Sequence, residues 1–325
     1  MHSGKKKILS WLTAGDVSIQ YQVYRDLIHS PAKTTISVQK RIENEGWGAR
    51  FLSKQKADGH WGITFYQPKW TSTHYTLLDL KTIGLCPDNK AVQKSVSMVL
   101  CQPSGAYGGI NLAVSLVNSD VCVNGIILSY ASWFLPGDDR LKSVVDYLLD
   151  VQMADGGWNC RYLNEHTTYS SVHSTISVLE GLLQFRRTRQ RYRTEEIIGA
   201  EKEAVEFLLN HNLYQSRRTG KVIDERMVKL SFPCRWRYDI LRCLDYMRDA
   251  ETPYDPRMES ALDIIAGKER KDGRWTLEQK HAGQVHFDME RVGTPSRWNT
   301  LRCLRVLNYF KVYLAESRAL SQWVS

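Results

Sequence analysis

The chain has 325 residues, with 44 lysines and arginines against 35 aspartates and glutamates, which gives a net charge of +9. Hydrophobic residues make up 42% and charged residues 24% of the chain. This composition excludes an intrinsically disordered, collagen-like or low-complexity protein. The length is sufficient to bury a large core, and the 10 tryptophans and 16 tyrosines supply unusually many aromatic side chains for it.

The cysteines and apolar segments bear on localisation. The seven cysteines are scattered and form no Cys-x-x-Cys pair, which favours a reducing compartment. Asp16 and Gln20 interrupt the first apolar stretch, and no small-residue cleavage site follows it, so we expect no signal peptide. The longest apolar segment, 121–135, falls short of the roughly 20 residues of a membrane span. The sequence predicts a cytoplasmic protein, with peripheral membrane contact left open.

An arginine-rich connection carries much of the positive charge. It has two interpretations, a solvated loop or a surface for anionic lipid head groups. No helix-turn-helix, zinc-finger or RNA-recognition signature occurs, so we expect no nucleic-acid partner. The arginines concerned are Arg186, Arg187, Arg189, Arg191 and Arg193, with Arg217 and Arg218 nearby.

A turn motif recurs along the chain, in which a polar residue is followed by Asp-Gly and then a tryptophan. Three clear copies lie at 55–61, 152–158 and 269–275, and degenerate copies lie at 102–109 and 210–214. The intervals are about 46 to 61 residues, enough for two helices and two loops in each unit. Asp and Gly favour a tight turn, and repetition at matching places indicates a helical repeat protein.

Two kinds of helix alternate between these turns. The first kind has one apolar face and is predicted at 40–55, 91–101, 139–152, 195–211 and 257–267. The second kind is apolar on most faces, which is typical of buried helices, and is predicted at 17–29, 72–84, 119–135, 173–185, 236–248 and 297–313. The alternation predicts a closed double ring, in which the second set forms an inner barrel and the first surrounds it.

These Gln-x-x-Asp-Gly-x-Trp turns between alternating helices resemble the repeat of the squalene and oxidosqualene cyclases. The same all-α fold, an α/α toroid, occurs in the β-subunits of protein prenyltransferases. The resemblance covers about 16–313 and implies one toroid domain over 1–325. It also implies an isoprenoid substrate, prenyl or terpenoid, in a central cavity, and leaves open a partner subunit of the kind that prenyltransferases have.

In such a toroid the inner helices run parallel, so their N-termini meet at one rim, where helix dipoles attract anions. Several polar or aromatic residues open these helices. An aromatic lumen suits a polyisoprene chain and stabilises a carbocation through its ring faces; ordinary core packing is the alternative. The residues predicted to bind substrate are Trp70, His74, Asn124, Arg235, Trp236, Tyr238, Arg297 and Trp298.

The likeness to the prenyltransferases implies a zinc site. Their β-subunits have an Asp-x-Cys at the start of one inner helix and a His at the start of the next. The matching residues here are Asp120, Cys122 and His173. These ligand types suit zinc and leave a position open for a substrate thiolate. However, 110–119 lacks the basic residues with which that family grips diphosphate, and Val123 replaces its Tyr.

The likeness to the oxidosqualene cyclases implies a different role for Asp120. Their general acid is the Asp of a Ser-Asp-Cys-Thr-Ala-Glu-Gly stretch, and residues 119–125 match it in place. Asp120 would then protonate an epoxide or alkene, which requires a raised pKa or activation by hydrogen bonds. The Asp-x-Asp-Asp of the bacterial hydrocarbon cyclases is missing. The catalytic candidates are therefore Asp120 and His173; a capping Asp and a buried Cys are the structural alternatives.

A second hypothesis is a binding protein that has kept the toroid and lost the chemistry, with a lipid, a peptide or a protein as its ligand. The missing motifs favour it, since a fold alone does not determine function. The sequence contains no P-loop, no Gly-x-Gly-x-x-Gly fingerprint, no Gly-x-Ser-x-Gly elbow and no His-Glu-x-x-His.

Overall fold

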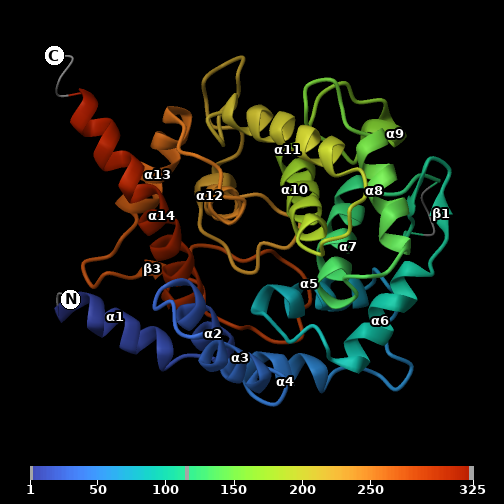
Figure 1. Cartoon of the computed structure of the whole chain (residues 1–325), viewed down its shortest axis with the longest axis horizontal. Coiled ribbons are helices and arrows are strands. Elements are labelled where there is room, and N and C mark those ends of the chain that lie inside the picture. Colours follow the sequence, from blue (N-terminus) through green and yellow to red (C-terminus); the bar gives the residue numbers. More distant parts are fainter. Residues whose placement is uncertain (1–2, 114–116, 322–325) are drawn as a thin grey trace.

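A computed structural model of the chain describes residues 3–113 and 117–321. Its helices form two concentric rings (Figure 1). The inner ring consists of α2 (Val17–Asp26), α5 (Thr73–Ile83), α7 (Val121–Phe134), α10 (Val172–Arg186), α12 (Ile240–Asp249) and α14 (Arg297–Ser321). The outer helices are α3 (Ala32–Arg41), α4 (Gly46–Leu52), α6 (Lys90–Leu100), α8 (Arg140–Asp150), α11 (Thr194–Leu209) and α13 (Glu259–Gly267). The predicted double ring is confirmed.

The remaining elements are short. Helix α1 (Ser3–Thr13) packs on α2, and α9 (Tyr162–Glu165) lies in the loop before α10. A small hairpin joins β1 (Ser104–Gly105) to β2 (Gly108–Ile110), and β3 (Trp275–Thr276) pairs antiparallel with β4 (Pro295–Ser296). Within the described part of the chain, every helix is too short or too polar to span a lipid bilayer.

The ring closes between its first and last helices. Helix α2 packs against α14, and Arg305 of α14 donates a hydrogen bond of 2.9 Å to Gln22 Oε1 of α2. On its other side, Gln22 Nε2 donates to Thr82 O of α5 over 3.0 Å. Gln22 therefore joins three segments that are far apart in the sequence.

Each clear copy of the turn motif connects an outer helix to the next inner helix. The indole Nε1 atoms donate to the carbonyl oxygen ten residues earlier, near the end of the outer helix, over 2.7 to 2.8 Å. The backbone N–H of each tryptophan donates over 3.0 Å to a threonine hydroxyl in the first turn of the inner helix. The pairs are Trp61 with Thr73, Trp158 with Thr175, and Trp275 with Thr300, and these indoles are buried.

The closest contact between inner helices is glycine-dependent. Helices α7 and α10 pack together over much of their length. A Cβ atom on Gly181 would lie 2.4 Å from Gly125 O, and one on Gly125 would lie 2.6 Å from Ser177 O. Any larger side chain at these two positions would push the helices apart.

Two helix predictions need correction. The predicted helix over 40–55 is in fact the end of α3, a turn, and α4. Gly46 has a φ of +60° there, and Asp16 Oδ2 accepts a hydrogen bond of 2.8 Å from Trp47 N, which leaves no space for a side chain at Gly46. The helix predicted from 236 begins only at Ile240, because Arg235 has a φ of +53° and Asp239 is the N-cap.

We predict that Trp158→Phe lowers the free energy of unfolding by about 1–3 kcal/mol, because the buried Leu148 carbonyl loses its indole donor. Urea unfolding with an unchanged m-value measures the loss. Tyr107 is an exposed aromatic residue, so Tyr107→Phe is the control and should change the free energy by less than about 0.5 kcal/mol. Equal effects of the two substitutions would contradict a structural role for the indole bond.

Candidate functional site

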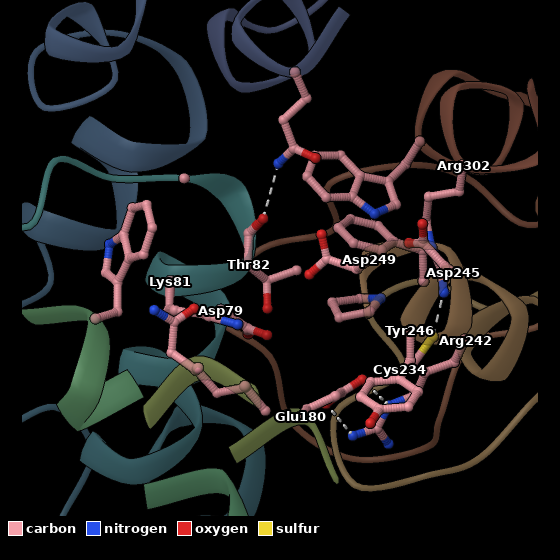
Figure 2. Close-up of a pocket in the computed structure, with 18 of the residues that line it drawn as sticks. Asp79, Lys81, Thr82, Glu180, Cys234, Arg242, Asp245, Tyr246, Asp249 and Arg302 are labelled. Atoms are coloured by element: carbon pink, nitrogen blue, oxygen red, sulfur yellow. Dashed lines mark hydrogen bonds and ion pairs between the residues drawn. The ribbon is translucent and has the colours of Figure 1, made fainter. Parts of the chain in front are cut away.

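A cavity of about 220 Å³ lies where the inner helices end, at the face that we call the C-terminal rim (Figure 2). Its lining comes from the second halves of α2, α5, α7 and α10, from most of the length of α12, from the first third of α14, and from the 232–235 loop. This volume is below the roughly 300–1,000 Å³ of sites for drug-sized molecules, so the cavity suits a small ligand.

Charged side chains dominate the lining, and cations outnumber carboxylates by eight to four. The cations are Arg25, Lys81, Arg187, Arg235, Arg242, Arg248, Arg302 and Arg305, and the carboxylates are Asp79, Glu180, Asp245 and Asp249. Helix C-termini carry partial negative charge, which favours cations at this rim. The dipoles and the four carboxylates compensate part of the excess positive charge.

Asp245 of α12 is the centre of the charge network. Its carboxylate accepts from Arg305 Nε over 2.7 Å, from Arg248 Nε over 3.2 Å and from Arg302 Nε over 3.3 Å. Burial acts to raise the pKa of Asp245, but Arg305, Arg248 and Arg302 together hold it well below its usual range. The carboxylate therefore stays ionised and holds three guanidinium groups in place.

The other carboxylates make simpler pairs. Arg242 binds Glu180 in a bidentate manner, with distances of 2.9 and 2.7 Å. Arg187 Nη1 lies 2.8 Å from Asp249 Oδ2.

The Asp79–Arg235 pair is deeply buried and makes a single contact of 3.2 Å. Burial raises the pKa of Asp79 in spite of the guanidinium beside it. The cavity therefore contains one carboxyl group that is biased toward its neutral form.

Two cationic groups of this cavity, from Lys81 and Arg235, have donors to spare. None of the residues that the structure describes hydrogen-bonds or forms an ion pair with the Lys81 ammonium. Burial lowers the pKa of Lys81, and Glu180 and Asp249 oppose that effect from a distance. The Nε–H of Arg235 is buried and also unpartnered. Buried donors normally find an acceptor, so both groups have spare capacity to bind an anion.

The opposite face, the N-terminal rim, contains Asp120. Asp120 is the N-cap residue of α7, but its side chain makes no capping hydrogen bond. It lines a narrow crevice with Tyr66, Leu112 and Val123. Burial raises the pKa of Asp120, and the Lys69 ammonium opposes this. The capping interpretation is therefore wrong, and a carboxyl group with a raised pKa faces the crevice.

The structure does not bring Asp120, Cys122 and His173 together as a metal site. Among residues 3–113 and 117–321, no group of three or more His, Cys, Asp or Glu side chains is placed to hold a metal ion. Cys122 instead contacts Cys160, whose Sγ accepts from Cys122 N over 3.1 Å. The Nδ1 atom of His173 accepts from Tyr238 N over 2.8 Å, so one potential ligand atom is already engaged.

Other groups of the protein contact the aromatic rings that were predicted to line the lumen. The Lys69 ammonium lies over Trp236 at 5.1 Å, Trp70 at 5.3 Å and Tyr66 at 5.9 Å from the ring centres. The loop between β3 and β4 closes over the same region, since Trp70 Nε1 donates to Ala282 O over 2.6 Å. Substrate binding by these rings stays a prediction.

Most of the other predicted substrate-binding residues have structural partners. His74 is buried against Tyr130, and burial lowers its pKa to about 3. Asn124 bonds both backbone groups of Ile110, Tyr238 Oη donates to Leu213 O, and Arg297 Nε donates to Trp11 O. Of the eight, only Arg235 and Trp298 line the charged cavity.

Some arginines of the arginine-rich connection form ion pairs within the protein. Arg186 pairs with Glu201, and Arg193 pairs with both Asp146 and Glu196. With the Arg187 pair in the cavity, three of the seven arginines therefore stabilise contacts between helices. Lipid contact through this connection stays a prediction.

Sequence reasoning missed Lys81, Asp245, Arg302 and Arg305. A signal was present, because charges recur every three residues on helices that are otherwise apolar, at 242, 245 and 248 and at 302 and 305. This spacing puts them on one face of each helix. Cys160 was also missed, since its partner Cys122 is 38 positions away.

Comparisons with known proteins bear on the fold. No protein-family model matches the chain, and no curated protein matches it. A solved polysaccharide lyase superposes with a TM-score of 0.50 at 10% identity, covering 97% of this chain and 99% of its own. A glycosyl hydrolase of family 88 from Bacteroides vulgatus gives 0.47 at 11%, covering 90% of this chain and 89% of its own.

The type II terpene cyclase MstE from Scytonema gives a TM-score of 0.43 at 15% identity, covering 90% of this chain and 87% of its own. The predicted α/α toroid is confirmed. The polysaccharide lyase, at a TM-score of 0.50, shares this fold. At these identities the likeness shows the fold alone.

We predict that His173→Asn reduces the acid sensitivity of the fold. Burial, with Arg242 and Arg237 adding to it, lowers the pKa of His173 to about 4. Below an unfolded pKa of about 6.5 the unfolded chain binds the proton first, so the free energy of unfolding falls as the pH drops toward 4. The Asn amide oxygen keeps an acceptor for Tyr238 N but does not titrate. Urea unfolding from pH 7 down to about 4 should show a shallower decrease in the variant; parallel curves would contradict this.

Proposed function

We propose that the protein binds a small anionic molecule, bearing carboxylate or phosphate oxygens, in the cavity of the C-terminal rim. The observation that carries the proposal is the unpartnered Lys81 ammonium in a cavity whose cations outnumber its carboxylates. The unpartnered Arg235 Nε–H supports it independently. Guanidinium and ammonium groups are the usual partners of such oxygens.

The internal ion pairs favour a preformed site. Because Asp245 fixes Arg248, Arg302 and Arg305, an incoming anion meets guanidinium groups whose positions are already set. Pre-organised donors bind with less loss of side-chain entropy. The site therefore needs no large rearrangement to accept a ligand.

The same charges argue against an isoprenoid chain in this cavity. An apolar chain would remove water from these charged groups without supplying acceptors, and desolvating unpaired charges is costly. An acidic sugar fits better, and the fold also occurs in a polysaccharide lyase and a glycosyl hydrolase. Asp79, whose pKa is raised by burial, would be the candidate proton donor beside such a ligand.

We predict that Lys81→Met weakens binding of an anion about tenfold or more, the loss expected for one charged hydrogen bond. Isothermal titration calorimetry with sulfate, pyrophosphate, citrate and glucuronate measures it and separates phosphate-like from carboxylate ligands. Lys202 is an exposed lysine on α11, so Lys202→Met removes the same charge outside the cavity and should leave binding unchanged.

The pH dependence of anion affinity is a second test of the role of Lys81. Since the pKa of Lys81 is lowered, its ammonium loses its proton at a lower pH than an exposed lysine would. Affinity for sulfate, which stays fully ionised, should therefore fall as the pH rises from about 7 to about 10, and fall less in Lys81→Met. Failure of all four anions to bind, or equal affinities of the two Met variants, would refute the proposal.

A second candidate function is proton donation by Asp120 to an isoprenoid at the N-terminal rim. The observation in its favour is that the Asp120 carboxyl group has a raised pKa and no partner among the described residues. Incubation with squalene and geranylgeranyl diphosphate, followed by product analysis, tests it. Turnover that is lost in Asp120→Asn and kept in Lys81→Met would establish this candidate. Anion binding without turnover would leave a binding protein.

A further inference from the structure

Two cysteines meet at the N-terminal rim, away from the charged cavity. Cys122 lies in the first turn of α7, and Cys160 follows the Trp158 turn. Their side chains are in hydrogen-bond contact, and both are partly exposed. By contrast, Cys86, Cys243 and Cys303 are buried.

The surroundings of Cys160 suit a thiolate. Its sulfur accepts from Cys122 N over 3.1 Å and from Ser174 Oγ over 3.3 Å. The first donor is a free N–H at the N-terminus of α7, where the helix dipole favours negative charge. The Cys122 thiol is a third donor.

Opposing effects are present but smaller. The hydrogen bond from the Cys122 thiol is the largest cause of a lowered pKa at Cys160, and it outweighs burial and the nearby Asp120 carboxylate, which act to raise it. The pKa of Cys122 is raised by the same hydrogen bond and by burial. One cysteine of the pair is thus biased toward the thiolate and the other toward the thiol.

We propose that Cys160 and Cys122 form a redox-active dithiol, in which Cys160 is the nucleophile toward hydroperoxides and Cys122 is the resolving thiol. The two cysteines are 38 positions apart, so no sequence motif marks the pair. The proposal is independent of anion binding at the other rim. A thiolate beside a second thiol and at a helix N-terminus is the arrangement that makes cysteines reactive.

The chemistry balances with the hydroperoxide as oxidant. The Cys160 thiolate attacks the outer peroxide oxygen, the O–O bond breaks, and the alkoxide or hydroxide that leaves takes up a proton. Cys160 is then a sulfenic acid. The Cys122 sulfur, as it loses its proton, attacks the Cys160 sulfur; the S–O bond breaks, water leaves and a disulfide forms. Two thiols are oxidised and one peroxide is reduced.

The reactivity of the thiols is tested first by alkylation. At about pH 6 to 7, iodoacetamide should label Cys160 at least about tenfold faster than Cys101 in the native protein, as followed by peptide mass spectrometry. Cys101 is the matched control, because it is the more exposed thiol and would react first if access alone decided the rate. Equal or slower labelling of Cys160 would overturn its role as the nucleophile.

Peroxide treatment then tests the pair. Hydrogen peroxide should convert reduced wild-type protein to a species with a Cys122–Cys160 disulfide, identified by non-reducing peptide mapping. In Cys122→Ser, oxidation should stop at a Cys160 sulfenic acid that dimedone traps, and Cys160→Ser should give neither product. Sulfate binding should be the same in all three, which separates this proposal from the proposed function. A wild type whose two thiols stay reduced while Cys101 oxidises would overturn it.

Discussion

The direction of the inner helices is the constraint on which the rest of the structure depends. Each repeat tryptophan joins the end of an outer helix to the start of the next inner helix, through one indole bond and one threonine bond. Because these two hydrogen bonds recur in each clear copy of the turn, the inner helices all start at one rim and end at the other. Helix polarity then gives the two rims opposite partial charges. The chemistry of each rim follows from that polarity.

At the C-terminal rim the helix ends favour cations, and four of the eight cations that line the cavity lie in or directly after the last turns of inner helices. So many positive charges in one cavity repel one another, and Asp245 relieves that repulsion by binding three guanidinium groups at once. A buried network of this kind contributes little net stability compared with apolar packing, and removing one member is costly. Stability alone therefore does not account for the network, whereas the proposed binding of an anion would use it.

Sequence reasoning predicted the ring and placed its candidate site at the N-terminal rim, whereas the charged cavity lies elsewhere in the ring. The repeat turns and the apolar inner helices were sufficient to predict the toroid, since both depend on local patterns. Predicting the site required knowing where the ring holds a cavity, and long-range contacts decide that. The loop between β3 and β4 reaches Trp70, which lies more than two hundred positions earlier, and Lys69 fills the space between three aromatic rings. Neither contact has a signature in the local sequence.

The N-terminal rim shows how helix polarity is used when no cavity is present. A helix N-terminus attracts negative charge, and a bound diphosphate is one way to supply it. Here the protein supplies acceptor groups of its own near the start of α7, the Asp120 carboxyl group and the Cys160 sulfur. The crevice beside Asp120 is narrow, so the groups best placed to react are those already in contact with each other. The sulfur pair meets this condition.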